Sequence, residues 1–194
     1  MKVAILGGTF NPPHFGHLFF ANEIRQKLNY DKIVFVPSLI SAHKKMDNTV
    51  SSSNRCDMVK LAIADYSWAE ISYCDIKRGG VTRTVDTIYD VIKEFNLDEK
   101  PGFIIGNDLV SSFHKWKDPE IITEISDLIV GVRDSAGFKL NYPHVLLNNR
   151  PFPLSSSEIR FMVNNNEYID FLLPQDVINY IKDNELYRKD KRDR

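Results

Sequence analysis

Short apolar runs alternate with longer amphipathic stretches along the chain. The apolar runs predict strands over residues 2–6, 32–36, 70–76, 102–106, 127–132 and 144–148. Stretches with apolar residues at helical spacing predict helices over residues 17–28, 55–66, 83–95, 156–166 and 174–184. Strands that alternate with helices in this way are typical of an α/β protein, so we expect a doubly wound, mostly parallel sheet.

One connection is longer than a plain turn. It runs over residues 37–54, is rich in Ser and Asn, and carries His43, Lys44 and Lys45. Loops of this length inside a compact domain are usually functional lids or disordered segments, and both interpretations stay open here. The remaining pattern predicts a single domain over residues 1–187, with a C-terminal helical part from about 155 to 187, and a charged, frayed tail over residues 188–194.

Composition narrows the classes of protein that fit. The chain has 194 residues, 43% hydrophobic and 26% charged, which is ordinary for a soluble single domain. Its net charge of −1 gives no overall field that attracts nucleic acid or an anionic membrane, so any anion site must be built locally. No run is long enough for a signal peptide or a membrane span, and Cys56 and Cys74 lack metal-ligand spacing. We therefore expect a cytoplasmic protein that acts on small molecules, without nucleic-acid or membrane partners.

The sequence GGTFNPPHFGH, residues 7–17, links the first predicted strand to the first predicted helix. Ligands of open α/β sheets bind beyond the carboxyl ends of the strands, and phosphates bind at helix N-termini. Gly7 and Gly8 have no Cβ, so a ligand can approach their backbone closely. His14 and His17 are three residues apart and would face one side, where both imidazoles can hold one phosphate. The glycine spacing differs from that of Walker A and G-x-G-x-x-G loops, so a different phosphate-binding device is predicted.

This stretch resembles the S/T-x-x-H-x-G-H signature of the HxGH nucleotidyltransferase superfamily, which has a Rossmann-like fold. More narrowly, it resembles the GGTFNPxHxGH motif of bacterial nicotinate mononucleotide adenylyltransferases, and other segments similar to that family follow in the same order. They are SAHKK (41–45) without the family's two prolines, TRTVDT (82–87) with Arg83 in place of a tyrosine, IIGNDLVSSFHKWK (104–117) with Asn107 in place of an alanine, and PLSSSEIR (153–160) with Ser157 in place of a threonine.

The resemblance implies a role for each of these motifs. The catalytic residues would be His14, His17, Lys44 and Arg160. ATP would be bound by Gly7, Gly8, Thr9, Phe10, His17, Gly106, Asp108, Ser155, Ser156, Ser157 and Arg160. The mononucleotide would be bound by Asn11, His43, Lys44, Thr84, Trp116 and Arg133. Mg²⁺ would accompany ATP, held mostly by water and phosphate oxygens, so no protein metal ligand is nominated.

Several of these residues also fit a purely structural interpretation. The hydroxyls of segments 82–87 and 153–160 can cap helices, because capping and phosphate binding use the same backbone N–H groups. Lys44 can be a solvated lysine. Trp116 can stack its flat indole on a pyridine ring, or it can pack in the core.

The implied reaction transfers the adenylyl group of ATP to nicotinate mononucleotide, giving nicotinate adenine dinucleotide and pyrophosphate in NAD biosynthesis. A phosphate dianion is already a nucleophile, so this chemistry requires positioning and charge stabilisation rather than a general base. Two alternatives stay open: a phosphopantetheine adenylyltransferase or other nucleotidyltransferase of the superfamily, and a nucleotide-binding regulator without catalysis. Nicotinate and nicotinamide mononucleotides both fit the motifs.

Overall fold

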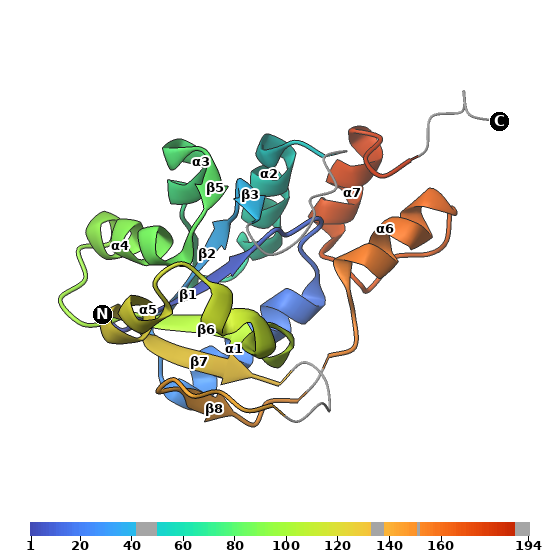
Figure 1. The fold of residues 1–194 in the computed structure, drawn as a ribbon. Helices are drawn as coiled ribbons and strands as arrows, with labels where there is room; N and C mark the ends of the chain where they lie inside the picture. Colours follow the sequence, from blue (N-terminus) through green and yellow to red (C-terminus); the bar gives the residue numbers. More distant parts are fainter. Residues whose placement is uncertain (42–49, 133–137, 151, 189–194) are drawn as a thin grey trace.

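The computed structural model describes residues 1–41, 50–132, 138–150 and 152–188. They form a six-stranded sheet in the order β4-β2-β1-β6-β7-β8, and every neighbouring pair of strands is parallel (Figure 1). The strands are β1 (Val3–Gly8), β2 (Lys32–Pro37), β4 (Ala69–Ile71), β6 (Gly102–Gly106), β7 (Asp127–Gly131) and β8 (Val145–Leu147). Counted along the chain, this is the 3-2-1-4-5-6 order of a Rossmann-type sheet, which confirms the predicted fold class.

Helices cover both faces of the sheet. One face carries α1 (Phe15–Leu28) and α2 (Ser52–Ile63), and the core on this side continues beyond the strand ends onto α6 (Ser156–Asn164) and α7 (Gln175–Asp183). The other face carries α3 (Cys74–Arg78), α4 (Thr84–Glu94), α5 (Pro119–Ile125) and the 3-10 helix η1 (Asn107–Lys115). Successive strand residues point into opposite cores, as Ile5 and Leu6 do in β1. Burial on both faces explains why the strands read as continuous apolar runs.

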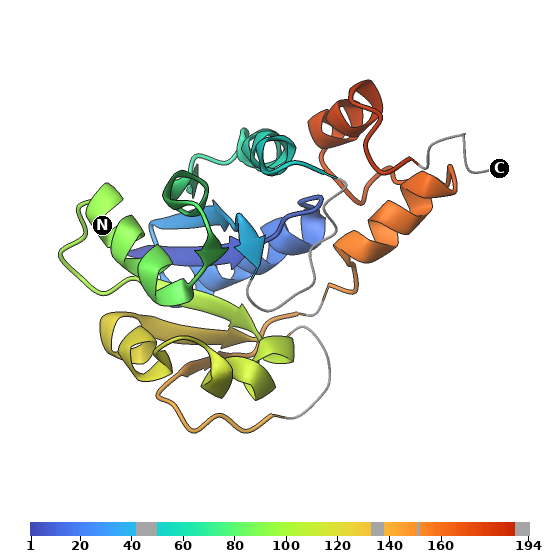
Figure 2. The ribbon, with the colours of Figure 1, turned by 45° about the horizontal axis from the view of Figure 1, so that its top comes forward.

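The end of the chain returns to its beginning. Figure 2 shows α6 and α7, in orange and red, beside the end of the sheet where β1 leads into α1. The backbone N–H of Phe15 donates to the carbonyl of Leu172, over 3.0 Å.

Across the described ranges, no helix combines the length and the apolarity that a membrane crossing requires.

Several boundaries differ from the sequence prediction. The strand predicted over 70–76 is wrong in its second half, because β4 ends at Ile71 and α3 begins at Cys74. There the Ser72 Oγ accepts the N–H of Cys74 over 3.2 Å and turns the chain away from the sheet. Helix α1 begins at Phe15, before the predicted start, because His14 serves as its N-cap.

Short elements were not predicted at all. They are α3, α5, η1 and a second, two-stranded sheet that pairs β3 (Ile40–Ser41) with β5 (Val81–Thr82). The two-residue strands and the short helices α3 and α5 carry too few positions for a hydrophobic period to emerge. Strand β3 lies within the long polar connection, of which residues 42–49 are outside the described residues, as are residues 189–194 of the predicted tail.

A buried ion pair fastens the β8 edge of the sheet to α1. Glu23 is 8% exposed, and its carboxylate accepts hydrogen bonds from the backbone N and the Nη2 of Arg150, at 3.0 and 2.9 Å. The Lys27 Nζ lies 3.1 Å from the same carboxylate. Burial alone would raise the pKa of Glu23, but the bonds from Arg150 and Lys27 outweigh it and hold the pKa at about 2.

Replacing Glu23 by Gln is expected to lower the free energy of unfolding by about 2 kcal/mol near neutral pH, because a charged hydrogen-bond acceptor is lost. The folded pKa of about 2 lies below the ordinary value of 4.5, so the stabilisation is complete above that ordinary value and is lost as the pH falls toward 2. Urea unfolding of both proteins at about pH 6 and about pH 3 checks this, and their difference should narrow at the lower pH. An equal difference at both pH values would contradict the assignment.

Candidate active site

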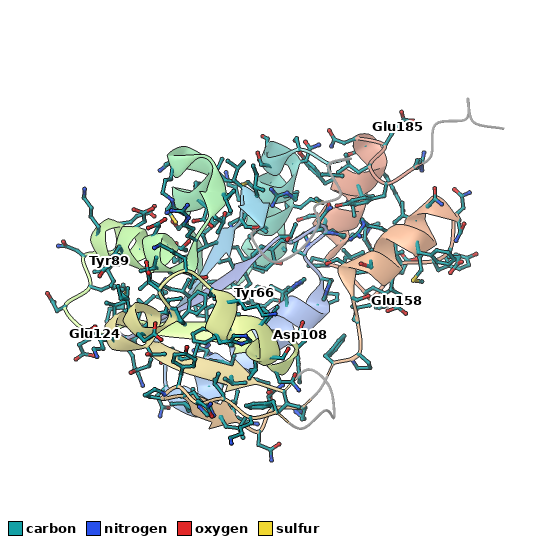
Figure 3. All side chains as sticks on the ribbon, in the orientation of Figure 1. Tyr66, Tyr89, Asp108, Glu124, Glu158 and Glu185 are labelled. Carbon is teal, nitrogen blue, oxygen red and sulfur yellow. The ribbon has the colours of Figure 1, made fainter. Side chains whose placement is uncertain are left out.

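The crevice between β1 and β6 is the topological switch point of the sheet. The two strands are neighbours, but α1 follows β1 on one face and η1 follows β6 on the other. Doubly wound sheets bind ligands beyond the carboxyl ends of such a strand pair. The predicted residues Gly7, Gly8 and Gly106 lie at these strand ends, and the exposed Asp108, labelled in Figure 3, begins the segment after β6. The structure therefore brings two motifs together that are a hundred residues apart in sequence.

The loop after β1 is anchored by an aromatic side chain and leaves open space beside Gly7, whereas a Cβ at Gly8 would lie 3.0 Å from the Phe10 ring. Phe10 adopts a left-handed backbone conformation (φ 49°), which is uncommon and strained for a bulky residue. The residue is 2% exposed, and its ring packs against Phe35 and His17, with centroid distances of 5.8 and 5.1 Å. The Phe10 side chain is therefore part of the core and is not offered to a ligand. A Cβ added at Gly7 would meet no atom within 4 Å, so space remains beside that backbone.

The two histidines of the motif lie side by side. Their ring centroids are 3.8 Å apart, as the three-residue spacing predicts. The backbone N–H of His14 donates to the Nδ1 of His17 over 3.2 Å. Because Nδ1 accepts this bond, a neutral His17 carries its proton on Nε2, which is then a donor suited to an anion. His14 is 1% exposed, and His17 is half-buried.

Gly16 makes room for the first histidine. A Cβ at this position would lie 2.9 Å from both the Cε1 and the Nδ1 of His14, closer than real Cβ contacts allow. Any larger residue would push the imidazole out of its place at the helix start. The glycine between the two histidines is thus explained by the geometry of the free protein.

The predicted C-terminal cradle contacts the first loop directly. Ser156 Oγ donates to the carbonyl of Pro12 over 2.8 Å, and Arg160 Nη1 donates to the carbonyl of Asn11 over 2.9 Å. The Arg160 Nη2 also bonds to Ser157 Oγ, at 3.3 Å. The N-terminus of α6 therefore lies against the GGTFNPPH loop, and both predicted anion-binding segments face one region.

The hydroxyl groups of segments 82–87 and 153–160 make different contacts in the structure. Ser155 caps α6, since its Oγ accepts the N–H of Glu158 over 3.2 Å. Thr82 does not cap α4, because its Oγ1 accepts the N–H of Leu39 over 3.1 Å. Thr84 is the first residue of α4 and is half-buried. The capping interpretation therefore holds for Ser155, and the predicted ligand contacts of Ser155 and Thr84 stay predictions.

Trp116 packs in the second core in this structure. It is 7% exposed, and its ring centroid lies 5.1 Å from that of Phe113 and 6.3 Å from that of Phe103. This is the arrangement that the structural interpretation describes, and stacking on a pyridine ring stays a prediction. His43, Lys44 and Arg133 lie outside the described residues.

A buried carboxylate supports the N-terminus of α4, where Thr84 lies. Asp75 is 2% exposed and accepts a 2.6 Å hydrogen bond from Thr87 Oγ1. It also pairs with Arg78, which bonds to Asp90. Burial alone would lower the pKa of Arg78, but the two carboxylates raise it overall. This network joins α3 to α4 and fixes the start of the latter helix.

Two residues that hold the loop were missed by sequence reasoning. Tyr187 OH donates to Asn11 Oδ1 over 2.7 Å, and Arg55 Nη1 donates to the carbonyl of Thr9 over 2.7 Å. No local pattern marks Tyr187, because its partner is 176 residues away. Arg55 did leave a signal, since it shares the apolar stripe of its predicted helix with Val59. Asn11 is 5% exposed and is held at both its carbonyl and its side chain.

Two further features lie outside this site. Burial raises the pKa of both thiols, that of Cys74 to about 11, so neither is a thiolate nucleophile near neutral pH.

An apolar cavity of about 320 Å³ lies against α1, and no predicted site residue lines it. Its walls are Phe15, Leu18, Phe19, Asn22, Tyr66, Trp68, Phe152 and Phe171.

The chain is similar to a known protein family and to named proteins within it. Fold and site define a nucleotidyltransferase, and residues 5–161 match the model of the cytidylyltransferase-like family. A protein of Borreliella burgdorferi named "Probable nicotinate-nucleotide adenylyltransferase" is 46% identical over 190 residues, which cover 97% of this chain and 98% of that one. A protein of the same name from Bacillus licheniformis is 35% identical, covering 96% and 98%. The chain belongs to the nicotinate-nucleotide adenylyltransferase family.

Solved structures show the same fold. The nicotinic acid mononucleotide adenylyltransferase of Plasmodium falciparum, complexed with NaAD, superposes with a TM-score of 0.75 at 21% identity, covering 96% of this chain and 97% of that one. A putative nicotinate-nucleotide adenylyltransferase of Vibrio parahaemolyticus superposes with a TM-score of 0.70 at 23% identity, covering 98% of each chain.

Replacing Gly16 by Ala is expected to lower kcat/KM for adenylyl transfer by about tenfold or more while the protein stays folded, because the new Cβ displaces His14. Steady-state kinetics and circular dichroism together check this. The matched control is Gln26→Ala, a change at an exposed position of the same helix, which should keep wild-type activity. Full activity of Gly16→Ala would show that the position of the His14 ring is unimportant.

Proposed function

We propose that the protein transfers the adenylyl group of ATP to nicotinate mononucleotide, giving nicotinate adenine dinucleotide and pyrophosphate, in NAD biosynthesis. The observation that carries the proposal is the meeting of His14 and His17 with Ser156 and Arg160 around one loop at the switch point. The names of the relatives, at up to 46% identity over nearly the full chain, support the choice of substrates. The NaAD bound to the Plasmodium falciparum protein supports it at the level of the fold.

In this reaction an oxygen of the mononucleotide phosphate attacks the α-phosphorus of ATP. The new phosphorus–oxygen bond forms in line with the breaking bond to the β-phosphate bridging oxygen, and pyrophosphate leaves with that electron pair. The attacking phosphate needs no deprotonation by the protein, which therefore contributes positioning and charge stabilisation.

The residues divide this work by position. His17 donates from Nε2 to the α-phosphate as negative charge builds on it, and His14 lies beside it at the same helix start. Lys44 closes over the phosphates. Ser157 and Arg160, at the N-terminus of α6, hold the leaving β- and γ-phosphates, because a helix N-terminus favours an anion.

ATP acts in such enzymes together with a divalent cation, and we propose Mg²⁺. The described residues contain no group of three or more His, Cys, Asp or Glu side chains that would form a protein cage. A metal carried by phosphate oxygens and water fits such a site, because Mg²⁺ keeps several waters and uses few protein ligands. When bound, it would neutralise part of the triphosphate charge. Asp108 is the exposed carboxylate at the end of β6, where it can accept hydrogen bonds from ribose hydroxyls.

The purified protein is expected to release pyrophosphate from ATP only when an acceptor is present, with the highest kcat/KM for nicotinate mononucleotide. The panel compares nicotinate mononucleotide, nicotinamide mononucleotide and phosphopantetheine as acceptors, and ATP with CTP as donors. Turnover of phosphopantetheine in place of the mononucleotides would establish the rival transferase. ATP binding without any turnover would instead identify the non-catalytic regulator.

Replacing His17 by Gln is expected to lower kcat by about 100-fold or more, because the donor at the α-phosphate is lost. Gln at the third helical position can still accept the N-cap N–H, as in a capping box, so the helix start survives. His144→Gln is the control, since His144 is exposed and precedes β8. A kcat for His17→Gln close to that of the wild type would remove His17 from the mechanism.

A further inference from the structure

Arg55 buries a charge that the proposed mechanism does not use. The side chain is 1% exposed and shares the apolar stripe of α2 with Val59 and Ala62. Within the part of the chain that the structure describes, no carboxylate forms an ion pair with it, and its Nε has no hydrogen-bond partner. A buried guanidinium without a carboxylate is costly, so its presence calls for a compensating role.

The guanidinium bridges two backbone segments. Its Nη1 donates to the carbonyl of Thr9 over 2.7 Å, and its Nη2 donates to the carbonyl of Leu39 over 3.2 Å. Thr9 belongs to the loop after β1, and Leu39 follows β2. Because the guanidinium is a planar fork with fixed spacing, it sets the separation of the two carbonyls. One side chain thus holds the ends of two neighbouring central strands in register.

These two segments lead to different parts of the candidate site. Thr9 is part of the loop that carries His14 and His17 toward the triphosphate. Leu39 precedes β3, after which the chain continues to residues 42–49 with Lys44. The N–H of Leu39 also donates to Thr82 Oγ1, and Thr82 lies two residues before Thr84 at the start of α4. The junction held by Arg55 therefore lies between the loop that carries the two histidines and the segment that is tied to the start of α4.

Arg55 supplies a positive charge as well as a hydrogen-bonding fork. Arg55 lies in the second turn of α2, close to the positive end of that helix's dipole, where a cation is disfavoured and an anion is favoured. Burial lowers the pKa of Arg55, but a guanidinium stays protonated in proteins. The planar hydrogen-bonding geometry and the positive charge belong to the same guanidinium, so a test needs substitutions that change one without the other.

We propose that Arg55 is a positioning residue for adenylyl transfer, which holds the loop after β1 at Thr9 and the chain after β2 at Leu39 in the separation that the reaction requires. The expected effect on kinetics rests on the proposed function. The expected effect on the two backbone segments rests only on the two hydrogen bonds. Arg55→Lys keeps the charge but offers a single ammonium, which cannot meet both carbonyls with the geometry of the fork. Arg55→Met removes charge and fork together.

Both variants are expected to lower kcat/KM with ATP and nicotinate mononucleotide by between about 10-fold and 100-fold, because small misplacements of bound substrates are costly. The KM values of both substrates should rise, and Lys should rescue no more than a small part of the loss. Amide hydrogen exchange of the free proteins should be faster over residues 8–12 and 37–40 in both variants, since both segments lose their shared tie. Circular dichroism at the assay temperature shows that the variants are folded.

Glu23→Gln is the matched control, because it removes a buried ion pair without touching either segment. It should keep wild-type kcat/KM and wild-type exchange over residues 8–12 and 37–40. Wild-type kinetics in Arg55→Lys would overturn the positioning role and leave only the charge. Unchanged exchange at both segments in Arg55→Met would overturn the inference whatever the substrate is. A wild-type protein without activity on nicotinate mononucleotide would refute the proposed function instead, and the exchange experiment would still decide the role of Arg55.

Discussion

The site depends on how the backbone carbonyls of one short loop are satisfied. The loop after β1 leaves the sheet with no neighbouring strand, so its carbonyls need partners from elsewhere. Side chains from two distant helices supply them: Arg55 of α2 at Thr9, and Arg160 and Ser156 of α6 at Asn11 and Pro12. Charged donors make such bonds stronger than neutral ones. A loop held from both sides keeps its N–H groups and its two histidines in place for a ligand.

The protein gathers groups suited to binding anions in one region although its net charge is −1. It does so by placing helix N-termini and a few cationic or imidazole side chains at one edge of the sheet. The starts of α1 and α6 meet at the loop, and the buried Arg55 lies beneath it. The arrangement of a few local groups can therefore provide what the overall charge does not.

Much of this could be predicted from the sequence, for reasons that differ between residues. The sheet was predictable because strands buried on both faces read as unbroken apolar runs, as β6 does. The histidine pair was predictable because its spacing is local and matches the helical period. The contacts of Arg160 with Asn11 and of Tyr187 with Asn11 were not, since they join residues 149 and 176 positions apart. The sequence also left open whether Trp116 is buried, because an indole can pack in a core or stack on a ligand.

The bond between Tyr187 and Asn11 also bears on how the protein is made. Synthesis proceeds from the N-terminus, and the GGTFNPPH loop leaves the ribosome first, long before its partners on α6 and at Tyr187. The nascent chain can pair β1 with β2 early, but the loop that follows β1 acquires its last hydrogen bonds only when nearly all the chain has emerged. A chain that ends before Tyr187 therefore folds without the hydrogen bond that fixes the side chain of Asn11.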